Sequence, residues 1–338
     1  MIDLSVLVPA RNEQWLKPTV EDVLKNRRGN TEVIVVCDGS WPLEGLVDHP
    51  HLRIVYEPVA VGQRAATNNA ALLSHARWIM KLDAHASVSE GFDVALMDAA
   101  KALGDDVVQI PRQYHLHVFN WKCQGCGTET YQGPTPTICN VCAAKGTPGG
   151  PFEKVWIWER RQSRWRTSTA KSKGGLIFSD TWRFDSTLHF QYFPELKARH
   201  PDGDFVETMS CLGACWFLSR ERFWQLGGLD NSHGSWGQMG TELACKAWLS
   251  GGRMLTNRRA WFAHLFRTQG GDWGFPYPLS NDQVEHARQY SRSLWLNDAW
   301  PGQVKPLRWL VEKFAPVPGW SKEQIEALPS TLKSERAA

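Results

Sequence analysis

No apolar run in these 338 residues approaches the ~20 residues that a membrane-spanning helix needs. Internal repeats and low-complexity segments are also missing. The formal net charge is only +3, too small to indicate a polyanionic partner from the total alone. Because the first residues run directly into an expected strand, the chain starts without a signal-peptide pattern. We therefore expect a cytoplasmic protein without a transmembrane segment and with reduced thiols.

Short apolar runs alternate with helical patterns through the first third of the chain. Four runs have the length and composition of buried strands: residues 4–9, 32–37, 52–56 and 78–82. Helical spacing of apolar residues fills 15–28 and 62–75 between them. Strands that alternate with helices predict an α/β fold in which a mainly parallel, Rossmann-like sheet carries helices on both faces.

Polar side chains gather where these expected strands end. They are Arg11, Glu13, Asp38, Arg64, Asp83 and His85. Open α/β sheets bind ligands at the carboxyl ends of their strands, so the cluster indicates a nucleotide site. Asp83 and His85 are two residues apart on an extended segment, which points both to one side and suits two metal ligands. Taken alone, an Asp-x-His pair is more often a surface turn after a strand.

The order and spacing of these segments resemble the family-2-type glycosyltransferases of the GT-A fold. Residues 6–13 are similar to the opening strand of that family, and 35–40 are similar to its second strand. Residues 62–70 resemble its Gly-x-x-x-Ala-x-Asn segment, and 83–85 stand in place of its Asp-x-Asp metal motif. The Asp-x-His form is similar to that of the polypeptide N-acetylgalactosaminyltransferases. The resemblance covers roughly 1–110 and 205–270.

The resemblance implies a donor site and a metal site. The residues that would bind a nucleotide-sugar are Pro9, Arg11, Glu13, Asp38, Arg64, Asn68, Asp83 and Trp236. Residues 263–267 resemble the family's Gly-His-Val-Phe-Arg segment, whose histidine is the third metal ligand. Asp83, His85 and His264 would then hold Mn²⁺ or Mg²⁺ with the diphosphate of the donor, although His264 taken alone could be a core histidine.

The acceptor side departs from the family pattern. Residues 236–242 resemble the Trp-Gly-Gly-Glu region, but Met239 and Gly240 stand where the family has acids. We expect Glu242 to take over the catalytic role, with Asp230 as the second candidate. The alternative for Glu242 is an exposed position on a helix.

Four cysteines have the spacing of a zinc ribbon. Cys123 and Cys126 form one C-x₂-C knuckle, and Cys139 and Cys142 form the other after twelve intervening residues. Four thiolates close a tetrahedral site, so we expect structural Zn²⁺ rather than a catalytic ion. Two disulfides are the alternative, which a reducing compartment disfavours.

A basic, tryptophan-rich stretch follows the ribbon. Residues 153–173 contain seven basic residues against Glu153 and Glu159. Such a stretch could bind a nucleic acid or an anionic glycan, could close over the donor as a loop, or could be a solvated element with packed tryptophans.

We expect four parts: a nucleotide-sugar-binding half at 1–115, a zinc-ribbon insertion at 116–150, an acceptor-side half at 151–300 and a helical tail at 301–338. The predicted function is metal-dependent transfer of a sugar from a nucleotide-sugar, with UDP as the expected nucleotide, to an acceptor hydroxyl. The acceptor could be a nucleic acid that binds 153–173, for example a hydroxymethylated pyrimidine in phage DNA. The alternative is a non-catalytic zinc-ribbon protein that binds nucleic acid and uses a nucleotide-binding scaffold.

Overall fold

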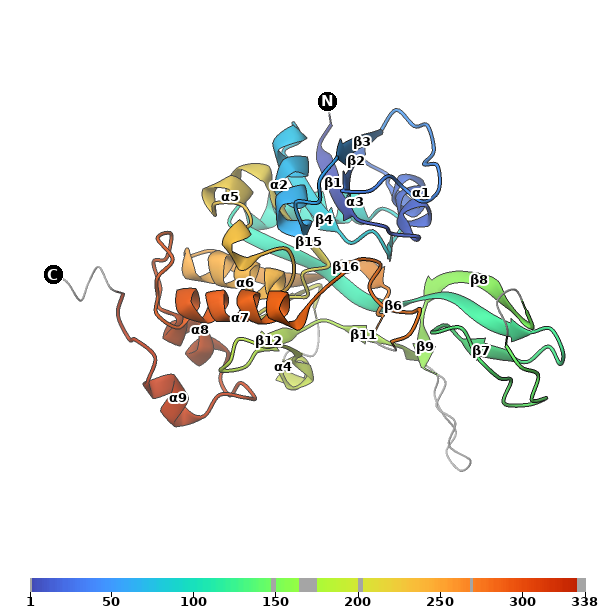
Figure 1. Ribbon diagram of the computed structural model, residues 1–338. Helices are drawn as coiled ribbons and strands as arrows, with labels where there is room; N and C mark the ends of the chain where they lie inside the picture. The colour runs from blue at the N-terminus through green and yellow to red at the C-terminus, as the bar shows by residue number, and fades with distance from the viewer. Residues whose placement is uncertain (1, 147–149, 164–174, 200–202, 268–269, 333–338) are drawn as a thin grey trace.

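A large mixed sheet forms the centre of the computed structural model, which describes residues 2–146, 150–163, 175–199, 203–267 and 270–332. Its strands follow the order β14-β16-β6-β15-β4-β1-β2-β3 (Figure 1). These strands are β1 (Leu4–Ala10), β2 (Thr31–Asp38), β3 (Leu52–Glu57), β4 (Trp78–Leu82), β6 (Val107–Cys123), β14 (Phe205–Glu207), β15 (Cys215–Ser219) and β16 (Arg253–His264).

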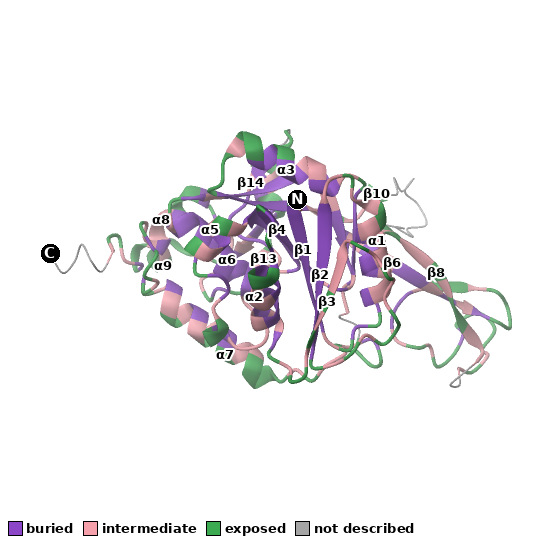
Figure 2. Cartoon of the chain, turned by 90° about the horizontal axis from the view of Figure 1, so that it is seen from above, coloured by how far each residue is buried: buried purple, intermediate pink, exposed green. Residues whose placement is uncertain are grey.

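The amino-terminal half of this sheet is parallel. β1 pairs in parallel with β2 and β4, and β2 pairs in parallel with β3. β15 returns antiparallel between β4 and β6, while β6 and β16 are parallel to each other. All residues of β1, β2, β4 and β15 are buried (Figure 2), as expected for strands with helices on both faces. The predicted α/β sheet is confirmed, and β14 and β15 are antiparallel strands within its main order.

Helices pack along the sheet, and α1 and α2 lie within the ranges 15–28 and 62–75 where the apolar spacing predicts helices. α2 packs on β1 and β2, whereas α3 and α6 pack on β16. The α7 helix begins at a capping box in which Ser280 and Gln283 bond reciprocally. The helices are α1 (Leu16–Asn26), α2 (Gln63–Leu73), α3 (Phe92–Leu103), α4 (Pro194–Arg199), α5 (Arg220–Gln225), α6 (Met239–Leu249), α7 (Asn281–Trp295), α8 (Leu307–Phe314) and α9 (Lys322–Glu326), with a 3₁₀ turn at Asn231–His233.

An arm projects from the sheet because β6 continues well beyond its partners there (Figure 1). The outer half of β6 pairs antiparallel with β7 (Glu129–Tyr131) and β8 (Phe152–Arg160). The arm therefore extends past residue 150, the predicted end of the insertion. The remaining strands are short: β5 (Ala86–Val88), β9 (Gln162–Ser163), β10 (Gly175–Leu176), β11 (Phe178–Ser179), β12 (Trp182–Phe184) and β13 (Phe190–Tyr192).

The carboxyl-terminal segment packs on the main domain. One face of α8 is buried against α6 through Leu307, Leu310, Val311 and Phe314. The ring centroids of Trp248 and Phe314 are 5.4 Å apart. Within the described residues, no helix is both long and apolar enough to span a bilayer.

Candidate metal centre and donor pocket

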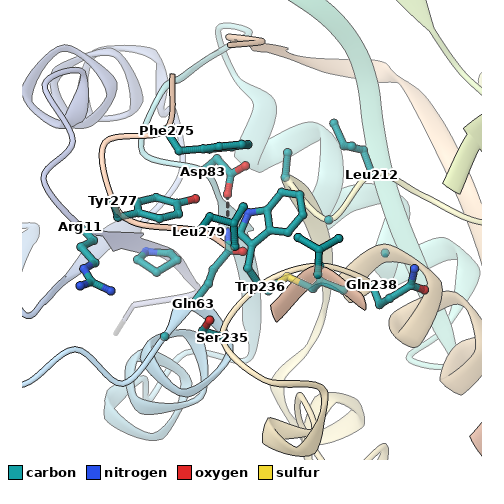
Figure 3. A pocket seen from close by; sticks show the side chains of 18 of the residues that line it. Arg11, Gln63, Asp83, Leu212, Ser235, Trp236, Gln238, Phe275, Tyr277 and Leu279 are labelled. Atoms are coloured by element: carbon teal, nitrogen blue, oxygen red, sulfur yellow. Dashed lines mark hydrogen bonds between the residues drawn. The ribbon is translucent and has the colours of Figure 1, made fainter. Parts of the chain in front are cut away.

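A cavity of about 440 Å³ opens at the carboxyl ends of β1, β2 and β4. Figure 3 shows its walls, with Arg11 on one side, Trp236 and Gln238 on another, and Asp83 between them. Its lining includes Pro9, Asp38 and Asp83, which lie at or just after the ends of these strands, and the segment 235–241. This is the edge at which open α/β sheets place ligands.

Three candidate metal ligands converge in this cavity. Their ligand atoms, on Asp83, His85 and His264, all lie within 4.8 Å of one another. The His264 Nε2 atom is 3.1 Å from the Asp83 carboxylate and 3.1 Å from His85 Nε2. The approach follows from strand pairing, because β5 lies antiparallel to the end of β16 with Ala86 opposite His264. One carboxylate and two imidazoles suit Mn²⁺ and similar divalent ions.

A second carboxylate orients His85. Glu13 accepts from His85 Nδ1 at 2.9 Å, which leaves His85 Nε2 directed at His264 and Asp83. A carboxylate behind a histidine is the usual arrangement in metal sites, since it fixes the ring and its tautomer. Arg267 and the Trp15 amide also donate to Glu13. Burial opposes the charge of Glu13, but His85 and Arg267 keep its pKa below the ordinary value.

The charge of Asp83 is stabilised by groups around it. Burial would raise its pKa, but the neighbouring Lys81 ammonium and the two histidines hold the pKa of Asp83 well below its usual range. Lys81 donates to Asp83 and, at 2.8 Å, to the Gly213 carbonyl. Gln63 donates to the same carboxylate at 2.8 Å (Figure 3). Burial lowers the pKa of His264 to about 4, so this ring is neutral near pH 7 and able to bind a metal.

The structure separates the predicted donor-site residues into two groups. Six of them line the cavity: Pro9, Arg11, Glu13, Asp38, Asp83 and Trp236. The Asp38 carboxylate also accepts from the amides of Val61 and Gly62, at 2.6 and 3.1 Å, so it shapes the loop that leads into α2.

Arg64 and Asn68 do not line the cavity, which corrects their predicted role as donor ligands. The Arg64 side chain is 2% exposed and donates to Glu242 and to the carbonyls of Gly234 and Gly237. Asn68 bonds both the amide and the carbonyl of Leu229, at 3.0 and 2.8 Å. Both side chains therefore hold the 228–238 segment against α2.

Glu242 lies inside the protein rather than at the acceptor side. Its side chain is fully buried and accepts from Arg64 at 3.0 Å, from Lys246 at 2.8 Å and from the Asp230 amide at 2.6 Å. With all these partners it has no path to an acceptor hydroxyl, and it is not the exposed helix residue of the alternative either. Burial opposes its charge, but Lys246 and Arg64 keep the pKa of Glu242 below the ordinary value.

Asp230, the second candidate for the catalytic role, also has hydrogen-bond partners within the protein. It caps the 3₁₀ turn by accepting from the Ser232 amide at 2.9 Å, and it accepts from the Tyr290 hydroxyl at 2.8 Å. Asp230 does not line the cavity. Among the described cavity-lining residues, the carboxylates are Glu13, Asp38 and Asp83, and each already has hydrogen-bond partners.

Sequence reasoning missed the segment that covers the cavity. Phe275, Tyr277 and Leu279 lie around Asp83 in Figure 3, and Phe275 meets Trp236 edge-on with centroids 5.5 Å apart. Burial, with the nearby carboxylates of Asp83 and Glu13, raises the pKa of Tyr277. The alternation of aromatics and prolines over 275–279 was the available signal. Sequence reasoning also missed the contact of Lys81 with Asp83, for which the available signal was a charged residue within an apolar strand.

The four ribbon cysteines come together at the tip of the arm. Their sulfur atoms lie within 4.8 Å of one another, with Cys123 and Cys142 at 3.7 Å and Cys126 and Cys139 at 3.6 Å. Tetrahedral zinc with bonds of ~2.3 Å places sulfurs about 3.8 Å apart, so the group fits this ion. All eight cysteines are free, and these separations exceed the ~2.05 Å of a disulfide bond.

The described part of the basic stretch packs on aromatic rings. Lys154 lies over Phe119 and Trp121, at 4.9 and 5.2 Å from their centroids. Arg160 lies over Trp261 at 4.6 Å, and Arg161 lies over a tyrosine ring at 4.0 Å. These cations stabilise the arm. Residues 164–173, which carry the rest of the predicted nucleic-acid-binding stretch, lie outside the described residues.

Comparison with known proteins identifies the class. Residues 5–124 match the sequence model of Glycosyl transferase family 2. The structure superposes on the crystal structure of GalNAc-T7 with UDP, GalNAc and Mn²⁺, with a TM-score of 0.59 and 16% identity over 88% of this chain and 50% of that one. Residues 5–124 are thus similar to family-2 glycosyltransferases, and the structure has the GT-A fold.

Particular relatives extend this similarity. Polypeptide N-acetylgalactosaminyltransferase 10 of Mus musculus is 31% identical over 270 residues, which cover 78% of this chain and 38% of the relative. N-acetylgalactosaminyltransferase 6 of Drosophila melanogaster is 28% identical over 117 residues, which cover 34% of this chain and 17% of the relative. The chain spans well under half the length of these relatives.

Proposed function

We propose that the protein is a metal-dependent glycosyltransferase that uses a nucleotide-linked sugar, with UDP as the nucleotide. The convergence of Asp83, His85 and His264 in a pocket of the GT-A fold carries this proposal. The UDP and Mn²⁺ named for the similar GalNAc-T7 structure support it. A bound divalent ion would stabilise the charge that develops on the leaving diphosphate.

The chain's own residues would prepare the site for this reaction. Glu13 holds His85 in the orientation that presents Nε2, and Gln63 with Lys81 fixes the Asp83 carboxylate. Arg11 lies at the cavity wall, where a guanidinium can bind phosphate oxygens. Phe275, Tyr277 and Leu279 line the cavity and would limit the access of water to a bound donor.

Release of UDP from a panel of UDP-sugars, measured with Mn²⁺ and without an acceptor, tests this function. The wild type should release UDP from at least one sugar, and Asp83→Asn should not. Lys17→Gln, a change on the exposed side of α1, is the control for purification. Absence of both UDP binding and release from the wild-type chain would refute the proposal.

We also propose that Cys123, Cys126, Cys139 and Cys142 bind one structural Zn²⁺. Metal analysis should find one zinc per chain, and Cys139→Ser should reduce it.

The nucleic-acid acceptor, including hydroxymethylated phage DNA, remains a prediction. The indole of Trp156 is 55% exposed and could stack on a base, while the neighbouring cations already pack on rings. Absence of DNA binding at low salt would remove this acceptor.

A further inference from the structure

The arm that carries the cysteines contacts the segment that covers the donor pocket. We propose that zinc in the ribbon holds Thr135 against Asp272 and so keeps residues 270–279 over the cavity. The proposal gives the arm a role in the proposed transferase. Asp272 and Thr135 would act as positioning residues. The zinc would be required for the shape of the donor pocket, although it would take no part in the reaction there.

The first contact is a pair of hydrogen bonds. The Asp272 carboxylate accepts from the Thr135 amide at 2.9 Å and from the Thr135 hydroxyl at 2.5 Å. These bonds with Thr135 lower the pKa of Asp272, so the carboxylate is charged near neutral pH. Beside them, Gly271 has φ +60, and a Cβ at this residue would lie in van der Waals contact with Pro134 at 3.4 Å. The two chain segments therefore lie against each other at consecutive residues.

The second contact is apolar. Trp273 is 4% exposed and belongs to a cluster built mainly from β6. Its ring meets Phe119 edge-on with centroids 5.3 Å apart, and it meets Trp15 at 6.4 Å. Trp15 follows Glu13 by two residues and donates its amide to that carboxylate. The base of the arm thus packs against both the cover of the pocket and the residue that orients His85.

The ribbon determines where Thr135 lies. Residues 127–138 form the loop between the two cysteine knuckles, and an ion shared by Cys126 and Cys139 would join the two ends of this loop. The proximal side of the loop is held by β6, where Gln132 bonds the Val118 amide at 2.6 Å and Trp121 bonds the Gly133 carbonyl at 3.1 Å. Zinc would hold the distal side, where the sulfur atoms of Cys126 and Cys139 lie 3.6 Å apart. Thr135 lies between these two attachments.

Loss of zinc should therefore release Thr135 and then Asp272. The cover would keep its chain connection through Trp273 but lose two charge-assisted hydrogen bonds. Phe275 and Tyr277, which follow within five residues of Asp272, would then sample positions away from Asp83. The strands β1 and β2 should not respond, since their strand partners are each other, β3 and β4 rather than strands of the arm.

Hydrogen exchange of residues 270–279, read by mass spectrometry together with zinc content, tests the proposal without requiring activity. Removing zinc with a chelator, or introducing Cys139→Ser, should speed exchange in 270–279 about ten-fold. Asp272→Ala should speed it to a similar extent while zinc content stays at one per chain. Thr135→Ser, which keeps the hydroxyl, should behave as the wild type. Glu159→Gln, an exposed change on the same arm, is the matched control.

Kinetics then link the contact to the site. Asp272→Ala should raise KM for the UDP-sugar several-fold and change kcat less, because the ligands Asp83, His85 and His264 stay in place. Unchanged exchange in 270–279 after zinc loss, or in Asp272→Ala, would overturn the proposal. If the wild type turns over no donor, the proposed function fails, but the exchange and zinc measurements still decide the role of the arm.

Discussion

Arg64 and Glu242 form an ion pair of 3.0 Å that is almost completely withdrawn from solvent, with side chains 2% and 0% exposed. The two residues are 178 positions apart and join α2 to α6. Arg64 also donates hydrogen bonds to the carbonyls of Gly234 and Gly237, which lie on either side of Trp236 in the sequence. The pair thereby shapes the wall of the cavity without facing it.

Glu242→Gln should destabilise the protein without abolishing its chemistry. Removing one partner of a buried pair typically costs about 3–5 kcal/mol, because the other charge is left uncompensated. Urea unfolding measures this loss. Glu90→Gln, which breaks the exposed pair with Arg28, should cost below about 1 kcal/mol and is the control.

The same variant decides whether Glu242 is a catalytic base. Donor hydrolysis and transfer, corrected for the folded fraction, should stay within a few-fold of the wild type. A loss of about 100-fold or more after this correction would instead restore the catalytic role predicted for Glu242 from the sequence.

Glu13→Gln should weaken metal binding. The carboxylate fixes the ring of His85, and loss of such a partner typically costs about 10–100-fold in metal affinity. Titration of UDP release with Mn²⁺ should show a higher half-saturating concentration, with a large part of the rate recovered at high Mn²⁺. Glu44→Gln, an exposed change, should leave the titration unmoved. An unaltered titration for Glu13→Gln would contradict this arrangement.

His233 should make stability depend on pH. Burial lowers the pKa of His233 to about 4, whereas an unfolded histidine titrates near 6.5. The unfolded state therefore binds more protons between these values, and the free energy of unfolding should fall as the pH drops from about 6.5 towards 4. His233→Gln should flatten this part of the stability curve. An equally steep curve in that variant would assign the dependence to other groups.

Arg11→Ala should weaken donor binding with little effect on folding. Arg11 lines the cavity and is partly exposed, so its removal leaves no buried group unpaired. KM for the UDP-sugar should rise about ten-fold, as expected for loss of a charge-assisted bond to phosphate. Arg11→Lys should recover part of this loss because it keeps the charge. Equal KM values for the wild type and Arg11→Ala would place the diphosphate elsewhere.

The sequence predicted the candidate site best where its residues follow directly after the ends of strands. Asp83 and His85 follow an apolar run, and the edge of a parallel sheet is a predictable place, so their meeting with His264 could be expected. The cysteine spacing predicted the cluster at the arm tip in the same way.

The roles of Arg64, Asn68 and Glu242 could not be deduced, because they depend on which distant segments pack together. No pattern in α2 indicates that its arginine meets a glutamate of α6, or that Asn68 bonds the backbone of Leu229. Arg64 and Asn68 match family positions in order and spacing, but local spacing does not show whether a polar side chain faces a cavity or the interior. The pocket cover was missed for the same reason.

The arm leaves and re-enters the domain at neighbouring points. Tyr114 of β6 pairs with Phe178 of β11, and the His115 amide bonds the Ile177 carbonyl at 3.1 Å. A short turn could therefore connect the two strands and excise the ribbon without cutting the central sheet. Such a deletion would still uncover Trp15 and Trp273, which pack on the arm. The arm is thus separable in its connectivity but not in its packing, so a shortened protein would need polar replacements at both tryptophans to stay soluble.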